Sequence, residues 1–352
     1  MADNANIFLV RQKFHSPQIN LARSASNRMW LVNICAFMAV IQSSLTDSYS
    51  SLLIALSAVS TAVLTEFLIL HKSKRIWMLM DGSAVASALI LTLLLPNRIS
   101  PLYAAAGAVF AIAVIKHSFG GLGSNWLNPA AGAWLFILFS WSPQFWSALE
   151  GSPLSVSVIG ESLRASNTAV AFGTASSLDA ALRSFLNRTV FSLIGAELPE
   201  GYMDLFASRF PGIIADRGVF ALLLGTIIIT ASQVNRAWIP IVYLGIFGFL
   251  VRLAGAIPYG TGIWNGDVLF TLCSGGTLVA AFFLSADPAT GAKSNMGILL
   301  ATLASGGIAF VFRCFGDAPY GAVLATIIIN AILPLVRVLE SWRLYNRQEL
   351  YS

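Results

Sequence analysis

The sequence has little charge for its length. Of its 352 residues, 11% are Asp, Glu, Lys or Arg, whereas 57% are hydrophobic and the mean hydropathy is +0.75. A soluble domain carries about 25% charged residues, so most of the surface of this chain faces something other than water. The composition therefore predicts an integral membrane protein. Basic cytoplasmic loops, rather than nucleic-acid binding, explain the net charge of +5.

The chain also lacks the residue spacings that mark most metal and nucleotide sites. It has three cysteines (Cys35, Cys273, Cys314) and three histidines (His15, His71, His117). The cysteines lie far apart in apolar stretches without a CxxC or Cys/His spacing, so we expect small buried hydrophobic side chains there. The histidines show no pairing across predicted helices that would hold haem. A Walker loop, a strand–helix GxGxxG and an HExxH motif are missing as well.

Hydrophobic runs of about 20 residues, the length that crosses a bilayer, recur along the chain. The first begins near Met29, and no cleavage site follows a short apolar core, so the polar, basic stretch before it is predicted to be a cytoplasmic tail. The predicted spans are 29–46, 50–70, 76–96, 100–116, 128–147, 217–234, 237–256, 264–285, 296–314 and 319–338. The predicted organisation is a tail (1–28), five transmembrane helices (29–147), an extracytoplasmic segment (148–216), five further helices (217–338) and a second tail (339–352).

Basic residues gather in the connections that share one side of the membrane if the spans alternate. These connections hold the run 71–75, Lys116, Arg236 and Lys293. An excess of Lys and Arg marks the cytoplasmic side, so both termini are predicted to be cytoplasmic. Two sets of five helices would be related by inverted topology, a plan common in transport folds, although no internal sequence repeat is evident.

Several intramembrane stretches are too rich in Gly, Asn, Asp and Pro to form regular helices. They are 81–83 (DGS), 120–130 (GGLGSNWLNPA), 274–277 (SGGT), 285–291 (SADPATG) and 313–317 (RCFGD). Non-helical backbone at this depth is tolerated where it is buried in protein or lines a cavity. Each stretch is therefore either part of a binding site, whose free backbone N–H groups can meet a phosphate or ring carbonyl, or a helix kink or close packing contact.

Charged side chains within the predicted spans, like the predicted helix breaks, indicate candidate functional residues. Asp81, Asp287, Arg252 and Arg313 lie in or at the ends of apolar runs, where an unpaired charge is unfavourable and a functional or paired role is the default. The two arginines could instead extend to the outer interface. Asp81 and Asp287 are the candidates for shaping an ion path.

The stretches GGLGSNWLNPA (120–130), SGGTLVAAFFLSADPATGA (274–292) and RCFGDAPYG (313–321) resemble the hallmarks of the NqrB/RnfD family. This family comprises the large membrane subunits of the sodium-pumping NADH:quinone reductase and of the Rnf ferredoxin:NAD complex. The resemblance covers about 10–340, and the length and short tails fit the RnfD branch. It implies an all-α integral membrane fold of about ten transmembrane helices in the inner membrane of a prokaryote.

The resemblance also implies two flavins. One is an FMN joined through its phosphate to a Thr hydroxyl in the extracytoplasmic segment, and the other is a non-covalent flavin within the membrane, FMN or riboflavin. The protein would supply position and electrostatics, and the cofactor the redox chemistry. The candidate residues for binding the membrane flavin are Lys116, Asn128, Ser274, Thr277 and Asp287.

The sequence departs from the family where the FMN is attached. The family pattern is D-G-x-S-x-A-T-x-L; here Ser176 stands in place of the acceptor Thr, Val170 in place of the Asp and Gly173 in place of the Ser. A phosphoester to Ser176 is chemically possible, and Thr174 is a second candidate acceptor. A non-covalent FMN, or no flavin at this position, is the alternative.

By resemblance, the chain would pass electrons through membrane flavins between ferredoxin and NAD, or related donors, coupled to Na⁺ or H⁺ translocation. It carries no soluble nucleotide or iron–sulfur domain, so it would not be catalytic alone and would need the Rnf-like subunits A, B, C, E and G besides membrane lipid. Two other classes stay open at this point: a flavin-binding or small-solute carrier, and a non-redox scaffold subunit.

Overall fold

A computed structural model describes most of the chain. The described residues are 25–46, 49–121, 123–149, 176–193, 195, 197–198, 200–207, 212–234, 236–260, 262–316 and 318–349. Their regular structure is all helical: they contain helices joined by turns and loops and no β-strand, apart from one isolated bridge between Pro96 and Ile213. The predicted all-α membrane fold is confirmed.

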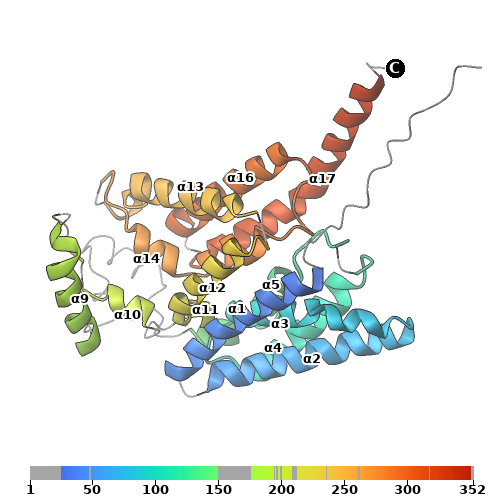
Figure 1. The fold of residues 1–352 in the computed structure, drawn as a ribbon, viewed down its shortest axis with the longest axis horizontal. Coiled ribbons are helices and arrows are strands. Elements are labelled where there is room, and N and C mark those ends of the chain that lie inside the picture. The colour runs from blue at the N-terminus through green and yellow to red at the C-terminus, as the bar shows by residue number, and fades with distance from the viewer. Residues whose placement is uncertain are drawn as a thin grey trace, which may run out of the picture.

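Among the described residues, four helices contain a stretch long and apolar enough to cross a membrane as a single unit. They are α1 (Ala25–Thr46), α2 (Ser50–Lys72), α16 (Asn295–Phe315) and α17 (Gly321–Glu349). Figure 1 shows the long helices running roughly side by side along the longest axis of the molecule, whereas α9 (Ser177–Thr189) lies across that direction at one end.

The other predicted spans are each built from shorter helical pieces. In chain order these pieces are η1 (Ile76–Asp81), α3 (Ser83–Leu93), α4 (Pro101–Val109), the π-helix η2 (Phe110–Lys116), α5 (Pro129–Ser140), α6 (Ser142–Ser147), α12 (Val219–Ala231), α13 (Trp238–Ala254), α14 (Val268–Cys273), α15 (Thr277–Val279) and the π-helix η5 (Ala280–Leu284). The segments between the predicted spans hold η3 (Phe191–Leu193), α10 (Tyr202–Phe206), α11 (Ile214–Arg217), which ends where the sixth span begins, and η4 (Ile257–Tyr259). Helical segments therefore occur at all ten predicted positions, while the count of ten membrane crossings stays a prediction.

The two halves of the chain meet along small residues of α1 and α12. A Cβ added to Gly218 would lie 2.7 Å from the carbonyl oxygen of Ala39, and one added to Gly225 would lie 2.9 Å from Cβ of Cys35. Such close backbone approach is how membrane helices associate without a hydrophobic driving force. Cys35 thus acts as the small buried side chain that the sequence predicted, and Cys273 and Cys314 are free and buried as well.

Within each half, the corresponding helices pack in corresponding ways: α2 against α4, and α13 against α16. This matches the inverted-repeat hypothesis, which stays a prediction.

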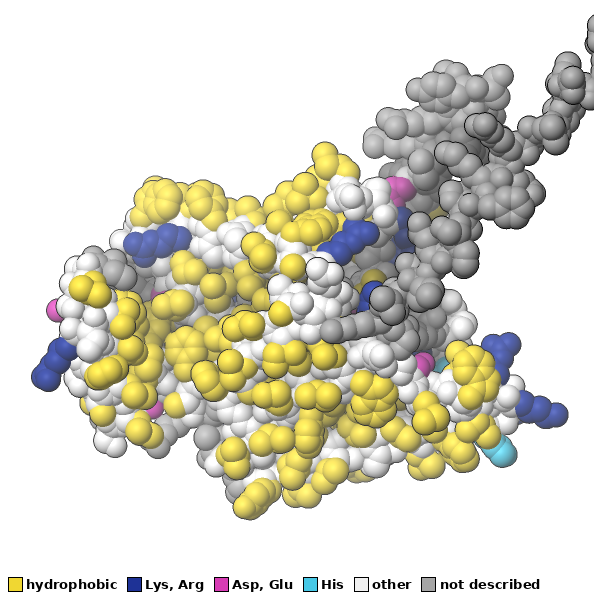
Figure 2. All heavy atoms as spheres, viewed as in Figure 1, with side chains coloured by type: hydrophobic (Ala, Val, Ile, Leu, Met, Phe, Trp, Pro, Cys, Tyr) yellow, Lys and Arg dark blue, Asp and Glu magenta, His cyan; other side chains and the backbone are white. Residues whose placement is uncertain are grey.

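The flanks of the helix bundle are apolar. Figure 2 shows hydrophobic side chains covering a broad face of the molecule, over the same helices that Figure 1 labels. Among the most exposed are Leu45, Leu68, Phe139, Ile227, Ile241, Met296, Val338 and Leu335. Exposed apolar area on this scale marks a surface that faces lipid or another protein, as the composition predicts.

Four of the five stretches that were predicted to interrupt regular helices do so. The prediction for RCFGD (313–317) is wrong for residues 313–315, which continue α16 to its end at Phe315. Residues 117–121 and 123–128 form turns and loops, with Gly120 and Gly121 in the left-handed region at φ 106° and 93°. The break in the eighth predicted span falls at Gly275 and Gly276, at φ 64° and 68°. Gly82, at φ 76°, separates η1 from α3. Glycine adopts these conformations without the steric penalty that other residues have.

Candidate functional site

Three of the predicted site residues line one pocket at the end of the bundle that the loop charges predict to be cytoplasmic. The pocket lies between the starts of α1, α3 and α5, the end of η2 and the residues after η5. Its walls are Met29, Val32, Ser83, Ala86, Ser87, Ile90, Lys116, Asn125, Asn128, Pro129, Phe283, Asp287, Pro288 and Ala289, and the space between them, open solvent included, is about 650 Å³.

Lys116 reaches one side of the pocket from the last turn of η2. Its ammonium forms a buried ion pair with Glu66 of α2 and donates a hydrogen bond to Ser83 Oγ at 2.5 Å. Ser83 in turn is fixed by Asp81, whose Oδ1 accepts from Ser83 Oγ at 2.5 Å and from Ser83 N at 2.8 Å. Asp81 therefore does not line the pocket itself. The hydroxyl of Ser83 connects it to Lys116, because this hydroxyl donates to Asp81 and accepts from Lys116.

Asn128 and Asp287 meet at the opposite side. Asn128 Nδ2 donates to Asp287 Oδ2 at 3.1 Å, while Asn128 Oδ1 accepts from Ala130 N at 3.0 Å. The second contact makes Asn128 the N-cap of α5, a role for which Asn is among the preferred residues, with Pro129 at the first helical position. Asp287 Oδ1 accepts from Ala289 N at 3.0 Å. Two broken segments far apart in the sequence therefore form one wall.

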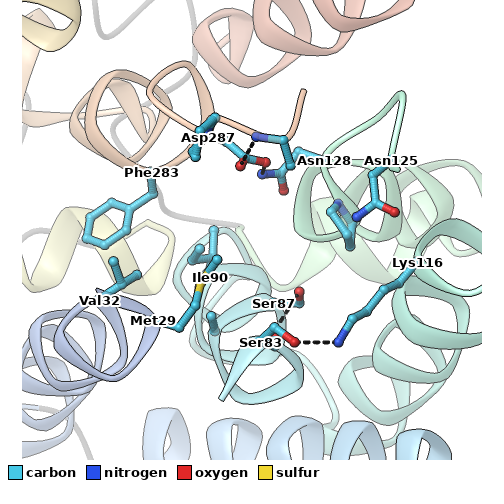
Figure 3. A pocket seen from close by; sticks show the side chains of 14 residues that line it. Met29, Val32, Ser83, Ser87, Ile90, Lys116, Asn125, Asn128, Phe283 and Asp287 are labelled. Atoms are coloured by element: carbon cyan, nitrogen blue, oxygen red, sulfur yellow. Dashed lines mark hydrogen bonds between the residues drawn. The ribbon is translucent and has the colours of Figure 1, made fainter. Parts of the chain in front are cut away.

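The pocket has a polar part and an apolar part. In Figure 3, the apolar side chains of Met29, Val32, Ile90 and Phe283 lie toward the left, whereas Lys116 and Asn125 lie at the right and Asn128 and Asp287 at the top. Apolar walls with a few convergent polar groups are typical of small-molecule and cofactor sites.

Two residues of this region were not identified from the sequence. Asn125 lies inside the predicted break, where the carbonyl oxygens of Gly121 and Lys116 lie 3.2 Å from one end of its side-chain amide; two acceptors there require the amide nitrogen, as their donor, at that end. Glu66 is 2% exposed. It is the lone acidic residue in the apolar run 50–70, and that isolation was a signal that could have found it.

Ser274 and Thr277 do not line this pocket. They flank the break between α14 and α15, where the guanidinium of Arg313 donates to the carbonyl and hydroxyl oxygens of Ser274 and to Thr277 Oγ1 at 2.6 Å. Gly276 N donates to Asp216 Oδ1 at 3.1 Å. The sequence predicted that backbone N–H groups of this break could bind a ligand. The N–H group of Gly276 instead donates to the carboxylate of Asp216.

The two intramembrane arginines differ. Arg313 is fully buried, so the alternative that it extends to the outer interface is wrong; it holds the helix break together. Arg252 is exposed, and its Nη1 donates to the carbonyl oxygen of Gly266 at 3.3 Å.

Ser176, the candidate FMN acceptor, begins α9. Its Oγ accepts from Asp179 N at 3.1 Å and donates to Asp204 Oδ1, and its backbone N donates to Asp204 Oδ2 at 2.9 Å. Ser176 is therefore an N-cap residue tied to α10. Thr174, Val170 and Gly173 lie outside the described residues.

Comparison with known proteins shows which family this chain is similar to. The family model described as "NQR2, RnfD, RnfE family" matches residues 13–346. The chain is 31% identical over 351 residues to the D subunit of the ion-translocating oxidoreductase complex of Vibrio cholerae, covering 94% of this chain and 98% of that one.

Two ferredoxin:NAD⁺ relatives cover the chain equally well. It is 29% identical to the D subunit of the proton-translocating ferredoxin:NAD(+) oxidoreductase complex of Clostridium ljungdahlii and 27% identical to the Na(+)-translocating counterpart of Acetobacterium woodii, each over 94% of both chains. A family match across nearly the whole length, with relatives of matching length, leaves one conclusion: the chain belongs to the NQR2/RnfD/RnfE family of membrane subunits.

Proposed function

We propose that this chain is the RnfD-type membrane component of an Rnf-type complex and holds a non-covalent flavin in the pocket between Lys116 and Asp287. In this role it passes electrons through the membrane between ferredoxin and NAD, or related donors, while the complex moves Na⁺ or H⁺. The donor and acceptor reactions belong to partner subunits of the A, B, C, E and G type.

The composition of the pocket carries the proposal. An isoalloxazine ring is planar and apolar on its faces and has a hydrogen-bonding edge of carbonyl and ring-nitrogen atoms. The pocket offers Phe283 and Ile90 for the faces, and the Asn125 amide, the Ser87 hydroxyl and the Lys116 ammonium for the edge. A cation beside the ring favours a flavin that gains negative charge on reduction. The residues present therefore fit the group.

The contacts of Ser176 support a non-covalent flavin over a covalent one. The Ser176 hydroxyl already accepts one hydrogen bond and donates another, and the Asp of the family's acceptor pattern is absent from the sequence. We propose that Ser176 serves here as a helix cap. The same observation favours the second candidate function, a scaffold subunit that has lost its redox role.

We also propose that the end of the bundle that holds the pocket faces the cytoplasm. Basic side chains cluster where α2 ends (Figure 2), which supports a cytoplasmic position for this end of the bundle. The pocket opens at the same end, so it is placed to exchange electrons with a cytoplasmic partner.

Two neighbouring residues of α3 provide a matched test. Ala86 lines the proposed flavin pocket, and Val85 lines a separate apolar groove between α1 and α2. We expect Ala86→Leu to fill the pocket and lower the bound flavin per purified protein, measured by absorbance, and Val85→Phe to leave it unchanged. Equal flavin in both variants would contradict the assignment of the pocket, and a colourless wild-type protein would favour the scaffold.

A further inference from the structure

A second pocket lies next to the proposed flavin pocket, at the same end of the bundle. Its walls come from the start of α1, the connection between α12 and α13, and the stretch from the end of η5 to the first turn of α16. They are Arg28, Val234, Arg236, Ile239, Ser285, Ala286, Asp287, Pro288, Gly291, Ala292, Lys293 and Ile298, and the space between them, open solvent included, is about 750 Å³. Asp287 and Pro288 line both pockets, so the two share part of one wall.

Three basic side chains from separate segments line this second pocket, which we call the basic pocket. Arg28 lies in the first turn of α1, Arg236 precedes α13, and Lys293 directly precedes the N-cap of α16. Arg236 Nη1 donates to Asn295 Oδ1 at 2.6 Å, a partner without charge. Among the described residues, no carboxylate lies within ion-pair distance of any of the three. Their charges are therefore available to a ligand.

The carboxylates near the basic pocket already accept other hydrogen bonds. Asp287, the acidic residue in its wall, accepts from Ala289 N through Oδ1 and from Asn128 Nδ2 through Oδ2. Glu340 of α17 accepts from the backbone N–H group of Lys293 and is not part of the wall. Three cations thus face one carboxylate that is engaged elsewhere. A cleft lined mainly by one sign of charge concentrates ions of the opposite sign, so the basic pocket is suited to an anion.

The basic pocket also has an apolar part that continues onto the flank of the bundle. Four of its wall residues are hydrophobic and buried: Val234, Ile239, Ala286 and Ala292. Ile241, two residues after Ile239 on α13, is 65% exposed. Met296 and Leu300, each two residues from Ile298 on α16, are also more than half exposed. An anion that carries hydrocarbon chains can therefore place its charge in the pocket and its chains along this flank.

We propose that the basic pocket binds the phosphate of an anionic phospholipid headgroup. Arg and Lys side chains form charge-assisted hydrogen bonds with phosphate, which are roughly twice as strong as neutral ones. Basic pockets between membrane helices on the cytoplasmic side are typical sites for anionic headgroups. The phosphate of an FMN in the neighbouring pocket has the same chemistry, but a lipid also accounts for the apolar flank. The choice of leaflet rests on the proposed orientation, whereas the binding site itself depends neither on that orientation nor on a flavin.

Native mass spectrometry of the purified full-length chain measures this binding directly. The chain is washed free of copurified lipid in a neutral detergent and is titrated with dioleoyl phosphatidylglycerol. Dioleoyl phosphatidylcholine, which has the same chains and phosphate but no net charge, is the comparison lipid. We expect the first phosphatidylglycerol to bind more tightly than the first phosphatidylcholine. Arg236→Gln/Lys293→Gln should weaken the binding of that phosphatidylglycerol about 25-fold, since each basic residue near an anionic lipid contributes about a factor of five.

Two further variants separate the pocket from general surface charge and from misfolding. Lys72→Gln/Lys74→Gln removes the same charge from the same end of the bundle but outside the basic pocket, and it should leave phosphatidylglycerol binding unchanged. Arg28→Gln/Lys293→Gln keeps the contact of Arg236 with Asn295, so it tests the pocket even if loss of that contact disturbs the start of α16. This variant should weaken binding as much as Arg236→Gln/Lys293→Gln.

The outcomes distinguish the sources of the phosphate. Equal binding of the two lipids, or equal weakening by the pocket variants and by Lys72→Gln/Lys74→Gln, overturns the proposal. The same variants are loaded with FMN or with riboflavin: pocket variants that lose FMN but keep riboflavin, with unchanged phosphatidylglycerol binding, assign the pocket to a flavin phosphate and also overturn it. A wild-type chain that binds phosphatidylglycerol selectively but holds no flavin supports this proposal and contradicts the proposed function alone.

Discussion

Asn128 Nδ2 and Asp287 Oδ2 lie 3.1 Å apart and join two broken segments separated by 159 residues of sequence. One segment belongs to the first half of the chain and the other to the second. The same two residues line the proposed flavin pocket. The contact therefore joins the two halves of the chain at the wall of the pocket.

Exchanging the two side chains should separate charge from geometry. Asn128→Asp places two carboxylates against each other, while Asp still caps α5, so we expect a lower melting temperature and weaker flavin retention. The double variant Asn128→Asp/Asp287→Asn restores a donor and an acceptor and should recover most of both losses. Thermal unfolding in detergent measures the coupling by a double-mutant cycle. Additive effects of the two substitutions would contradict a direct interaction.

Gly275 should tolerate no side chain. At φ 64° a Cβ would lie 2.4 Å from the carbonyl oxygen of Pro319 and 2.7 Å from Nη1 of Arg313. Gly275→Ala should therefore lower stability by more than about 1 kcal/mol, from backbone strain alone. Gly307, which lies within α16 with open space around it, is the control: Gly307→Ala should be neutral or stabilising. A similar loss in both variants would argue against the strained break.

Glu340 predicts a pH dependence at the predicted cytoplasmic face. Partial burial raises the pKa of this carboxyl, but hydrogen bonds from Ser294 Oγ and from the backbone N–H groups of Lys293 and Ser294 outweigh that effect and lower the pKa below its ordinary value of 4.5. The ionised form is thus favoured in the folded protein. Its contribution to stability is complete well above pH 4.5 and is lost as the pH falls through the lowered pKa.

The matched variant is Glu340→Gln, which keeps the shape and removes the titration. We expect the wild type to melt above the variant at about pH 7 and the difference to shrink as the pH approaches about 4. A difference that is constant over this range would show that the contacts of Glu340 with the start of α16 contribute nothing through charge.

Ser176 should behave as a helix cap. Ser176→Ala removes the acceptor for Asp179 N and should cost about 1 kcal/mol of stability, whereas Ser176→Thr should cost less. Intact-protein mass should show no added FMN in either variant or in the wild type. A wild-type adduct that disappears in Ser176→Ala would contradict the cap interpretation and restore the covalent flavin.

Most of the helix breaks and three pocket residues, Lys116, Asn128 and Asp287, could be predicted from the sequence for a physical reason. Glycine, proline and asparagine disrupt a membrane helix in a way that is visible locally, so the segments around Asn128 and Asp287 were identifiable without a structure. What the sequence could not show is which breaks share a cavity. Ser274 and Thr277 looked equivalent to Asn128, yet Arg313 and Asp216, which lie far from them in sequence, occupy the polar groups of that break. The pairing of Lys116 with Glu66 could not be predicted either. It depends on the packing of α2 against η2, and no local sequence pattern indicates that two distant segments pack together.

Whether the chain itself holds a flavin without a covalent bond is decided by the absorbance spectrum of the purified wild-type protein, followed by denaturation and filtration. We predict a stoichiometric flavin spectrum that is fully released into the filtrate. A flavin that stays with the denatured chain, or a protein without flavin absorbance, would contradict the proposed function.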